Sequence, residues 1–181
     1  MPRGRKSLSS LQQQGDRQWG GPALAGGVLT PAVVEFCQSG TSIVLASCDQ
    51  DGRPIVGRGL ACRIEADGKA RLVLRKSSNP KLLKSLADGA RFAVTFTQPS
   101  THRSIQLKAP SARIVDANVG DAPAAIAQTT AFRRDLMDVG YSEGFAQTYC
   151  GFEPHDLLTI TFAPEQAFVQ TPGPNAGSAL Q

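Results

Sequence analysis

The sequence is poor in the residues that build metal sites and disulfide frameworks. Among 181 residues it has only two histidines and four cysteines, and no two cysteines form a Cys-x-x-Cys motif. The cysteines lie far apart, in patterns typical of helices and strands, so we expect small buried residues in a reducing compartment. The sequence therefore predicts neither a metal site nor a disulfide.

Long hydrophobic runs are also missing. The most apolar stretch, residues 19–34, is interrupted by several glycines and by Pro22 and Pro31, which excludes a membrane-spanning helix. The basic residues at positions 3–6 are followed by polar residues, not by the apolar core of a secretory signal. We therefore expect a cytoplasmic protein with no membrane partner.

Positive charge is scarce outside the first residues. The net charge is +4, and residues 1–18 contribute +3 of it through four basic side chains and one acidic side chain. The other residues thus carry a net charge of only +1, and no basic stripe with interleaved aromatic residues is present. A nucleic-acid partner is therefore not expected.

Glycine and proline are plentiful, with 18 and 12 residues, and they separate short apolar segments. This pattern predicts strands joined by hairpins. The chain has no strand–helix–strand rhythm and no Gly-x-Gly-x-x-Gly motif, so we expect a mainly β fold, a small barrel with a few helices. The predicted strands are residues 42–47, 54–64, 69–75, 91–97, 102–115, 157–162 and 167–170, and the predicted helices begin near Pro31, Pro80, Ala122 and Tyr141.

The strand at residues 54–64 carries the first candidate binding residue. If side chains alternate along it, Arg58 lies in the middle of an apolar face, and the opposite face is nearly bare at Gly57, Gly59 and Ala61. A buried guanidinium is costly unless an anion pairs with it, and bare backbone often marks the approach of a ligand or of another chain. The alternative is an edge strand whose arginine reaches solvent.

A second candidate is the segment Arg75–Lys81, in which cations and hydroxyls precede a helix. Asn79 is expected to be the N-cap of this helix, and Pro80 its first residue. Free backbone N–H groups and the helix dipole would add to the positive potential, so the segment is a candidate phosphate site. The alternative is an ordinary solvated helix cap.

A third candidate is the strand that begins at His102. Its side chains His102, Ser104, Gln106 and Lys108 share one face, which forms a row of hydrogen-bonding groups. His102 is the best candidate for acid–base catalysis, because both of its protonation states are accessible near neutral pH. The alternative is a solvent-exposed strand face.

Together these segments resemble the pyridoxamine 5′-phosphate oxidase-like split barrels, which bind flavin mononucleotide (FMN). The resemblance covers residues 30–177, and the order and spacing of its motifs are more specific than any one motif. The segments that carry it are Ser-Ile-Val-Leu-Ala-Ser (42–47), Asp-Gly-Arg-Pro (51–54), Val-Gly-Arg-Gly-Leu-Ala-Cys-Arg (56–63), residues 78–86, His-Arg-Ser-Ile-Gln-Leu-Lys (102–108) and Phe-Val-Gln-Thr-Pro-Gly-Pro-Asn-Ala-Gly (168–177).

The resemblance implies a six-stranded antiparallel Greek-key barrel and a homodimer that holds FMN in a groove between its subunits. Arg58 and Lys81 would bind the phosphate, with Ser77 or Ser78 beside them, and Gln106 would contact the flavin. The backbone of residues 59–61 would follow the isoalloxazine ring. The full set of cofactor-binding residues expected on this basis is Arg58, Gly59, Leu60, Ala61, Arg63, Lys76, Ser77, Ser78, Lys81 and Gln106.

The implied activity is that of an FMN-dependent oxidoreductase acting on a small organic substrate. Pyridoxamine phosphate oxidases end in an Arg-Leu-x-Pro-like segment that grips their substrate, whereas this chain has an uncharged Thr-Pro-Gly-Pro segment. Pyridoxal phosphate synthesis is therefore not expected. The alternatives on the same fold are a non-enzymatic flavin or haem binder or sensor, and a deazaflavin-dependent reductase.

The chain is expected to divide into three parts. Residues 1–27 are polar and rich in glycine and glutamine, as in a flexible arm, and residues 28–170 form the barrel domain. Residues 171–181 have no charged side chain, and their prolines favour extended backbone. We expect this tail to pack over the barrel mouth or the dimer groove, next to the ligand site.

Overall fold

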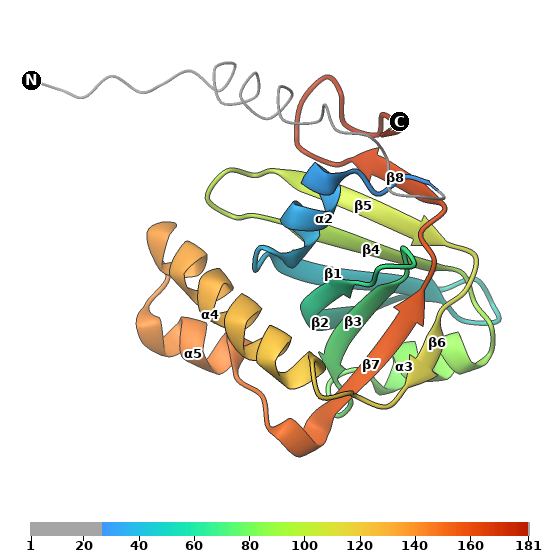
Figure 1. The fold of residues 1–181 in the computed structure, drawn as a ribbon, viewed down its shortest axis with the longest axis horizontal. Coiled ribbons are helices and arrows are strands. Elements are labelled where there is room, and N and C mark those ends of the chain that lie inside the picture. Colours follow the sequence, from blue (N-terminus) through green and yellow to red (C-terminus); the bar gives the residue numbers. More distant parts are fainter. Residues whose placement is uncertain (1–26, 181) are drawn as a thin grey trace, which may run out of the picture.

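The computed structural model describes residues 27–180, which form one antiparallel sheet with helices packed against it (Figure 1). Nearly all of the expected N-terminal arm, residues 1–26, lies outside the described part. The sheet has eight strands in the order β6-β7-β3-β2-β1-β4-β5-β8. The strands are β1 (Ser42–Cys48), β2 (Pro54–Ile64), β3 (Ala70–Arg75), β4 (Phe92–Thr97), β5 (Ser104–Ala109), β6 (Arg113–Val115), β7 (Leu157–Phe162) and β8 (Gln166–Val169).

The helices begin at or near the predicted residues. The N-cap of α2 (Pro31–Gln38) is Thr30, whose Oγ1 accepts a hydrogen bond from the N–H of Val33 at 3.3 Å. The N-cap of α5 (Glu143–Cys150) is Ser142, whose Oγ accepts one from Phe145 at 3.2 Å. The other helical elements are α3 (Pro80–Ala87), α4 (Asp121–Asp138) and the short 3-10 turn η1 (Pro154–Asp156).

The mainly β split-barrel fold is confirmed, but the sheet has eight strands instead of six and is not closed. The segment expected to be one strand, residues 102–115, forms two strands near opposite edges of the sheet. Strand β5 pairs with β4 and β8, whereas β6 pairs with β7. Pro110 lies between β5 and β6, and proline has no N–H to donate to a strand ladder. The chain therefore leaves β5 at this proline and crosses to the other edge.

One apolar core fills the inside of the curled sheet. Ile160 of β7 and Ala167 of β8 both belong to it, although their strands stand near opposite ends of the strand order, so the sheet wraps around the core. Helix α2 contributes Val33 and Phe36, and α3 contributes Leu82. On the side of the sheet that faces away from this core, α4 packs against Ala61 of β2 and Val73 of β3, whereas Val44 and Val56 are exposed.

The alternation of side chains along β2 breaks at a β-bulge between Gly59 and Ala61, which corrects the two faces expected from the sequence. Arg58, before the bulge, points away from the core toward α5. Beyond the bulge, Cys62 and Ile64 pack in the core, and Ala61 packs under α4. A bulge adds one residue to a strand and shifts its period, so strict alternation assigned these later residues to the wrong faces.

The bare side of β2 is filled from within the chain. A Cβ on Gly57 would lie 2.5 Å from Oδ1 of Asn79 and 2.6 Å from Leu82, and one on Gly59 would lie 2.7 Å from Ile43. These glycines therefore allow α3 and β1 to approach the β2 backbone closely. The strip is a packing surface, and it does not by itself indicate a ligand or a second chain.

Two glutamines complete the edge of β2 beyond the bulge, where β1 no longer pairs with it. The side chain of Gln128, on α4, accepts from the N–H of Cys62 at 2.8 Å and donates to its carbonyl at 2.6 Å. Oε1 of Gln38, on α2, accepts from the N–H of Ile64 at 2.8 Å. Side chains from two helices thus replace a strand here.

A buried ion cluster fixes the start of α4 to the sheet. Asp121 is fully buried, and its carboxylate lies 2.8 Å from Nη1 of Arg63 and 2.6 Å from Nη2 of Arg71. Thr159 and the N–H of Asn118 also donate to it. Burial by itself would raise the pKa of Asp121, but these hydrogen bonds outweigh burial and lower the pKa below its ordinary value. We call Arg63, Arg71, Asp121 and Thr159 the Asp121 cluster.

The C-terminal tail folds back on β8. The N–H of Val169 donates to the carbonyl of Ser178 at 2.9 Å, and the N–H of Leu180 donates to that of Ala167 at 2.8 Å. Leu180 is partly buried against the main core. The tail therefore covers the β8 edge of the sheet, and its expected place next to a ligand stays a prediction.

The four cysteines are free, and three of them are buried. Burial raises the pKa of the Cys37 and Cys62 thiols, so neither carries the thiolate that reactive cysteines need. Within residues 27–180, no helix is long and apolar enough to cross a membrane. The same residues contain no group of His, Cys, Asp and Glu side chains that could hold a metal ion.

Candidate functional site

One row of side chains crosses four neighbouring strands on the side of the sheet that faces away from the core. Arg58 of β2 lies opposite Val44 of β1, Val44 opposite Thr95 of β4, and Thr95 opposite Gln106 of β5. Adjacent strands lie about 4.8 Å apart, so the row extends over roughly 14 Å. The structure thus brings Arg58 and Gln106 to one surface. We call Val44, Val56, Arg58, Thr95 and Gln106 the outer sheet face.

The outer sheet face is apolar in its middle and polar at its ends. Val44 and Val56 have exposed fractions of 40% and 68%. At one end, Nε2 of Gln106 donates to Oγ1 of Thr95 at 3.1 Å, which fixes the carboxamide next to the apolar surface. An apolar surface with a few oriented polar groups is a feature of sites that bind small organic ligands.

The side chain of Arg58 is half-buried against α5. Its Cζ lies 3.4 Å from the centre of the Tyr149 ring, and its Nη2 donates to the Tyr149 carbonyl at 3.3 Å. Nη1 of Arg75 donates to the carbonyl of Gly151, just beyond the same helix, at 3.0 Å. The carbonyl end of a helix carries partial negative charge, so α5 supplies a negative partner for Arg58.

The two guanidinium groups remain a positive pair. None of the ion pairs formed within residues 27–180 involves Arg58 or Arg75. Burial lowers the pKa of Arg58; Tyr149 opposes this shift, and the charge of Arg75 adds to it. An anion beside the pair would relieve both the burial cost and the repulsion.

Asn79 joins this pair to the start of α3. It is buried, its Oδ1 accepts from the N–H of Arg58 at 2.9 Å, and its Nδ2 donates to the carbonyls of Arg58 and Arg75 at 3.1 and 2.7 Å. Asn79 occupies the expected N-cap position, but its side chain makes no capping hydrogen bond. The Asn79 side chain therefore does not cap the first turn of α3. That turn lies beside Arg58 and Arg75.

One of the polar residues around the start of α3 is hydrogen-bonded to a carboxylate, whereas three others are exposed. Oδ1 of Asp156 accepts from the N–H of Ser77 at 2.8 Å, and its other oxygen accepts from the Ser77 hydroxyl. These bonds lower the pKa of Asp156. Lys76, Ser78 and Lys81 are exposed. We call Arg58, Arg75, Lys76, Ser78 and Lys81 the basic corner.

The other predicted site residues lie elsewhere. Leu60 and Ala61 are buried with Val73 and Ala125 under α4, so only their backbone could meet a ligand. Arg63 belongs to the Asp121 cluster. His102 is exposed in the turn between β4 and β5, and its φ of 58° places it in the left-handed region, which histidine adopts more readily than most residues.

Sequence reasoning missed the aromatic stack that covers Arg58. The rings of Tyr141 and Phe145 stack with centres 4.7 Å apart, and those of Phe145 and Tyr149 with centres 5.5 Å apart. The spacing of Phe145 and Tyr149 on α5 could have revealed part of this stack, because residues four apart lie on one helix face, whereas Tyr141 precedes the helix. The carboxylate of Asp156 was also missed, and no local pattern distinguishes it.

Comparison with known proteins identifies the fold. No family model and no curated protein matches the chain. HupZ of Group A Streptococcus has a TM-score of 0.50 at 15% identity, covering 82% of this chain and 99% of HupZ. A candidate pyridoxamine 5′-phosphate oxidase from Lactobacillus delbrueckii has 0.49 at 14% identity (80% and 97% covered), and the haem storage protein HutZ of Vibrio cholerae has 0.45 at 16% identity (82% and 95% covered). At these identities the likeness shows the fold alone, the mainly β split barrel described above.

Proposed function

We propose that this split barrel binds FMN, with the ring system along the outer sheet face and the phosphate at the basic corner. The observation that carries the proposal is the row from Arg58 to Gln106, which places a cation and a carboxamide at the two ends of one apolar, exposed surface. This arrangement matches a ligand with a planar ring at one end and a phosphate at the other.

The residues of the basic corner fit a phosphate. A guanidinium has five N–H donors, so the bond from Arg58 to the Tyr149 carbonyl is compatible with further bonds to a phosphate. The first turn of α3, with no cap from Asn79, and Lys81 would supply additional donors and positive charge. Asp156 marks one boundary of the phosphate site. Its carboxylate already accepts hydrogen bonds from the N–H and the hydroxyl of Ser77, and it would repel an anion.

The proposed activity is that of an oxidoreductase acting on a small organic substrate. Bound FMN would supply the hydride or electron transfer, and the chain would supply position and electrostatics. The carboxamide of Gln106 would orient the ring, and the valines of the outer sheet face would exclude water from one side of it. His102 remains the acid–base candidate, although it lies in the turn before β5, four positions before Gln106.

A second copy of the chain would complete the site. Exposed valines in neighbouring strands form an apolar surface that a second subunit can cover. We expect a homodimer in sedimentation equilibrium at micromolar concentration with FMN present. A monomer under these conditions would contradict this part of the proposal.

Titration with FMN and with riboflavin tests the proposed site. Arg58→Ala should weaken FMN binding about tenfold to a hundredfold and leave riboflavin binding nearly unchanged, because a charge-assisted contact to phosphate is worth roughly 1.5–3 kcal/mol. Arg53→Ala is the matched control, because Arg53 lies in the same hairpin and is exposed. Equal losses for both ligands would assign Arg58 to the fold. A protein that ignores FMN and binds haem or a deazaflavin would overturn the cofactor assignment.

A further inference from the structure

The row of side chains that runs from Arg58 to Gln106 continues onto β8. Phe168 lies opposite Gln106 in the register of β5 and β8, and it is partly buried. The neighbouring residue Ala167 belongs to the core, so Phe168 points to the other side of the sheet, as the side chains of the outer sheet face do. An aromatic ring therefore borders the outer sheet face at the end opposite the basic corner.

A second row of side chains lies beside the first, two residues farther along each strand. Val56 of β2 lies opposite Ala46 of β1, which lies opposite Ala93 of β4. Ala93 in turn lies opposite Lys108 of β5. Both alanines are partly exposed, and each presents only a methyl group. The surface between Val56 and Lys108 is therefore apolar, and a cation stands at its end.

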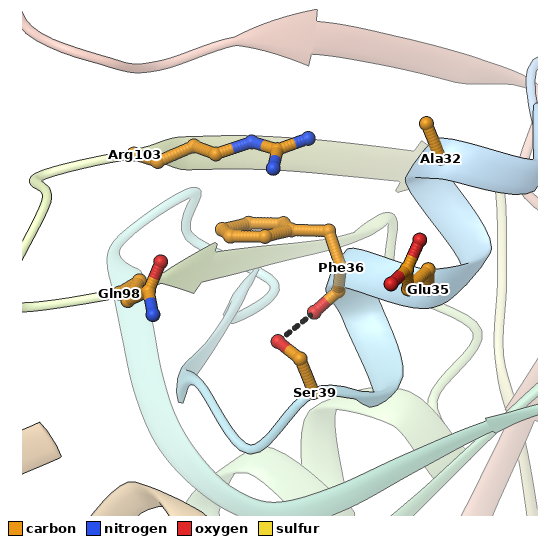
Figure 2. A pocket seen from close by; sticks show the side chains of 6 residues that line it. All are labelled: Ala32, Glu35, Phe36, Ser39, Gln98 and Arg103. Carbon is orange, nitrogen blue, oxygen red and sulfur yellow. Dashed lines mark hydrogen bonds between the residues drawn. The ribbon is translucent and has the colours of Figure 1, made fainter. Parts of the chain in front are cut away.

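Two cations in and just before β5 lie over aromatic rings, and the two contacts differ in their surroundings. Cζ of Arg103 lies 4.4 Å from the centre of the ring of Phe36, a core residue of α2, and Arg103 is half-buried there (Figure 2). Nζ of Lys108 lies 4.5 Å from the centre of the Phe168 ring, and Lys108 is exposed. The first contact packs against the core, whereas the second places an ammonium group beside the outer sheet face.

The ammonium group of Lys108 is not used by the proposed FMN site. None of the ion pairs formed within residues 27–180 involves Lys108. Its contact with the Phe168 ring attracts the ammonium to a defined place but does not neutralise its charge. The basic corner, three strands away, would take the single phosphate of FMN. Lys108 therefore provides a positive charge for a different anion on the same surface.

We propose that the substrate of this oxidoreductase is a small aromatic monocarboxylate, whose carboxylate pairs with Lys108 and whose ring lies over Ala46 and Ala93. The inference rests on the proposed FMN site, because it places the substrate on the surface that would hold the flavin. A planar ring can contact both alanine methyl groups at once, since adjacent strands lie about 4.8 Å apart. One carboxylate matches one ammonium. A second carboxylate would find no partner in the two rows, where Arg58 is the other cation and belongs to the phosphate site.

Titration of the FMN-loaded, full-length protein with benzoate, phenylacetate and trans-cinnamate tests the proposal, with calorimetry and the flavin absorption spectrum as readouts. At least one of them should bind saturably and change the spectrum. For the carboxylate that binds best, the corresponding amide should bind at least about fivefold more weakly, because it lacks the charge that pairs with Lys108. A protein that does not bind FMN would overturn the proposed function and this inference together. A protein that binds FMN but none of the carboxylates, or binds the amide equally well, would overturn this inference alone.

Variants of Lys108 assign the charge. Lys108→Gln should lower the affinity for the carboxylate to that for its amide and leave the affinities for the amide and for FMN unchanged, whereas Lys108→Arg should keep most of the preference for the carboxylate. Lys84→Gln, at an exposed position on α3, is the matched control and should bind as the unaltered chain does. Since Lys108 is exposed, its variants should fold, and a thermal melt checks this. An unchanged preference in Lys108→Gln would overturn the proposal. A loss of FMN affinity with riboflavin affinity retained would also overturn it, because Lys108 would then serve the phosphate of FMN.

Discussion

Strands β2 and β3 carry two pairs of arginines, and the two pairs have different negative partners. Arg63 and Arg71 face each other across the strands and share the buried carboxylate of Asp121. Arg58 and Arg75, toward the other end of the same strands, donate to carbonyls at the end of α5. A full negative charge compensates the first pair, whereas only the partial charge of a helix end faces the second. The first pair therefore serves the fold, and the second retains a positive potential that a ligand can use.

Removing the shared carboxylate should have the largest effect. Asp121→Asn leaves Arg63 without its ionic partner and leaves Arg71 with only its 3.8 Å pair to Glu65. Breaking a buried pair in this way costs about 3–5 kcal/mol of the free energy of unfolding. Urea denaturation measures it. Asp67→Asn is the control, because Asp67 forms an exposed pair with Lys69, and its replacement should change stability far less. Similar values for the two variants would mean that the Asp121 cluster is not a stabilising element.

The same cluster should make stability depend on acidity. The pKa of Asp121 is lower in the folded chain than in the unfolded chain, where it is about 3.9, so its contribution is complete above that pH. The contribution is lost as the pH falls through 3.9 toward the lower folded value. The difference in unfolding free energy between the unaltered chain and Asp121→Asn should therefore shrink from pH 7 to pH 3. A difference that stays constant would contradict this assignment.

Loss of the link between the arginines and α3 should have an intermediate effect. Asn79→Ala leaves the N–H of Arg58 and the carbonyls of Arg58 and Arg75 without their side-chain partner, which should cost about 2–3 kcal/mol. Thermal or urea unfolding measures the loss, with Gln147→Ala on the exposed side of α5 as the control. If the two variants were equally stable, Asn79 would not hold the basic corner together.

The smallest effect is expected where the positive pair meets α5. Tyr149→Leu removes the ring under Arg58 and should cost about 1 kcal/mol, in the range of a partly buried cation–π contact. Tyr149→Phe keeps the ring and should remain within about 0.5 kcal/mol of the unaltered chain. Equal losses in the two variants would assign the effect to the tyrosine hydroxyl and not to the ring.

Local patterns were sufficient to predict much of the fold. The helix starts near Pro31 and Pro80 and the strands joined by hairpins were predicted, because caps and turns depend on neighbouring residues. The bulge in β2 and the crossing of β6 to the far edge were not predicted. Both depend on pairing between distant segments, which the periodicity of one strand does not report.

The candidate site was predicted only in part, because its geometry also depends on contacts between distant segments. Arg58 and Gln106 were identified one at a time, and only the strand register shows that they share a face. The role of Arg63 was missed because Asp121 lies 58 positions away in the sequence. Asn79 was placed correctly at the start of α3, but its side chain bonds to β2, since Gly57 leaves room for it there.

The glutamines that complete the edge of β2 bear on how the chain avoids self-association while it folds. Until α4 docks, the N–H and carbonyl of Cys62 form an open strand edge that a second, partly folded chain could extend. Gln128 follows Cys62 by 66 residues, so a chain that emerges from the ribosome exposes this edge long before it can be covered. Replacing Gln128 with leucine should therefore lower the yield of refolding in proportion to protein concentration, a kinetic loss by aggregation that equilibrium stability alone would not reveal.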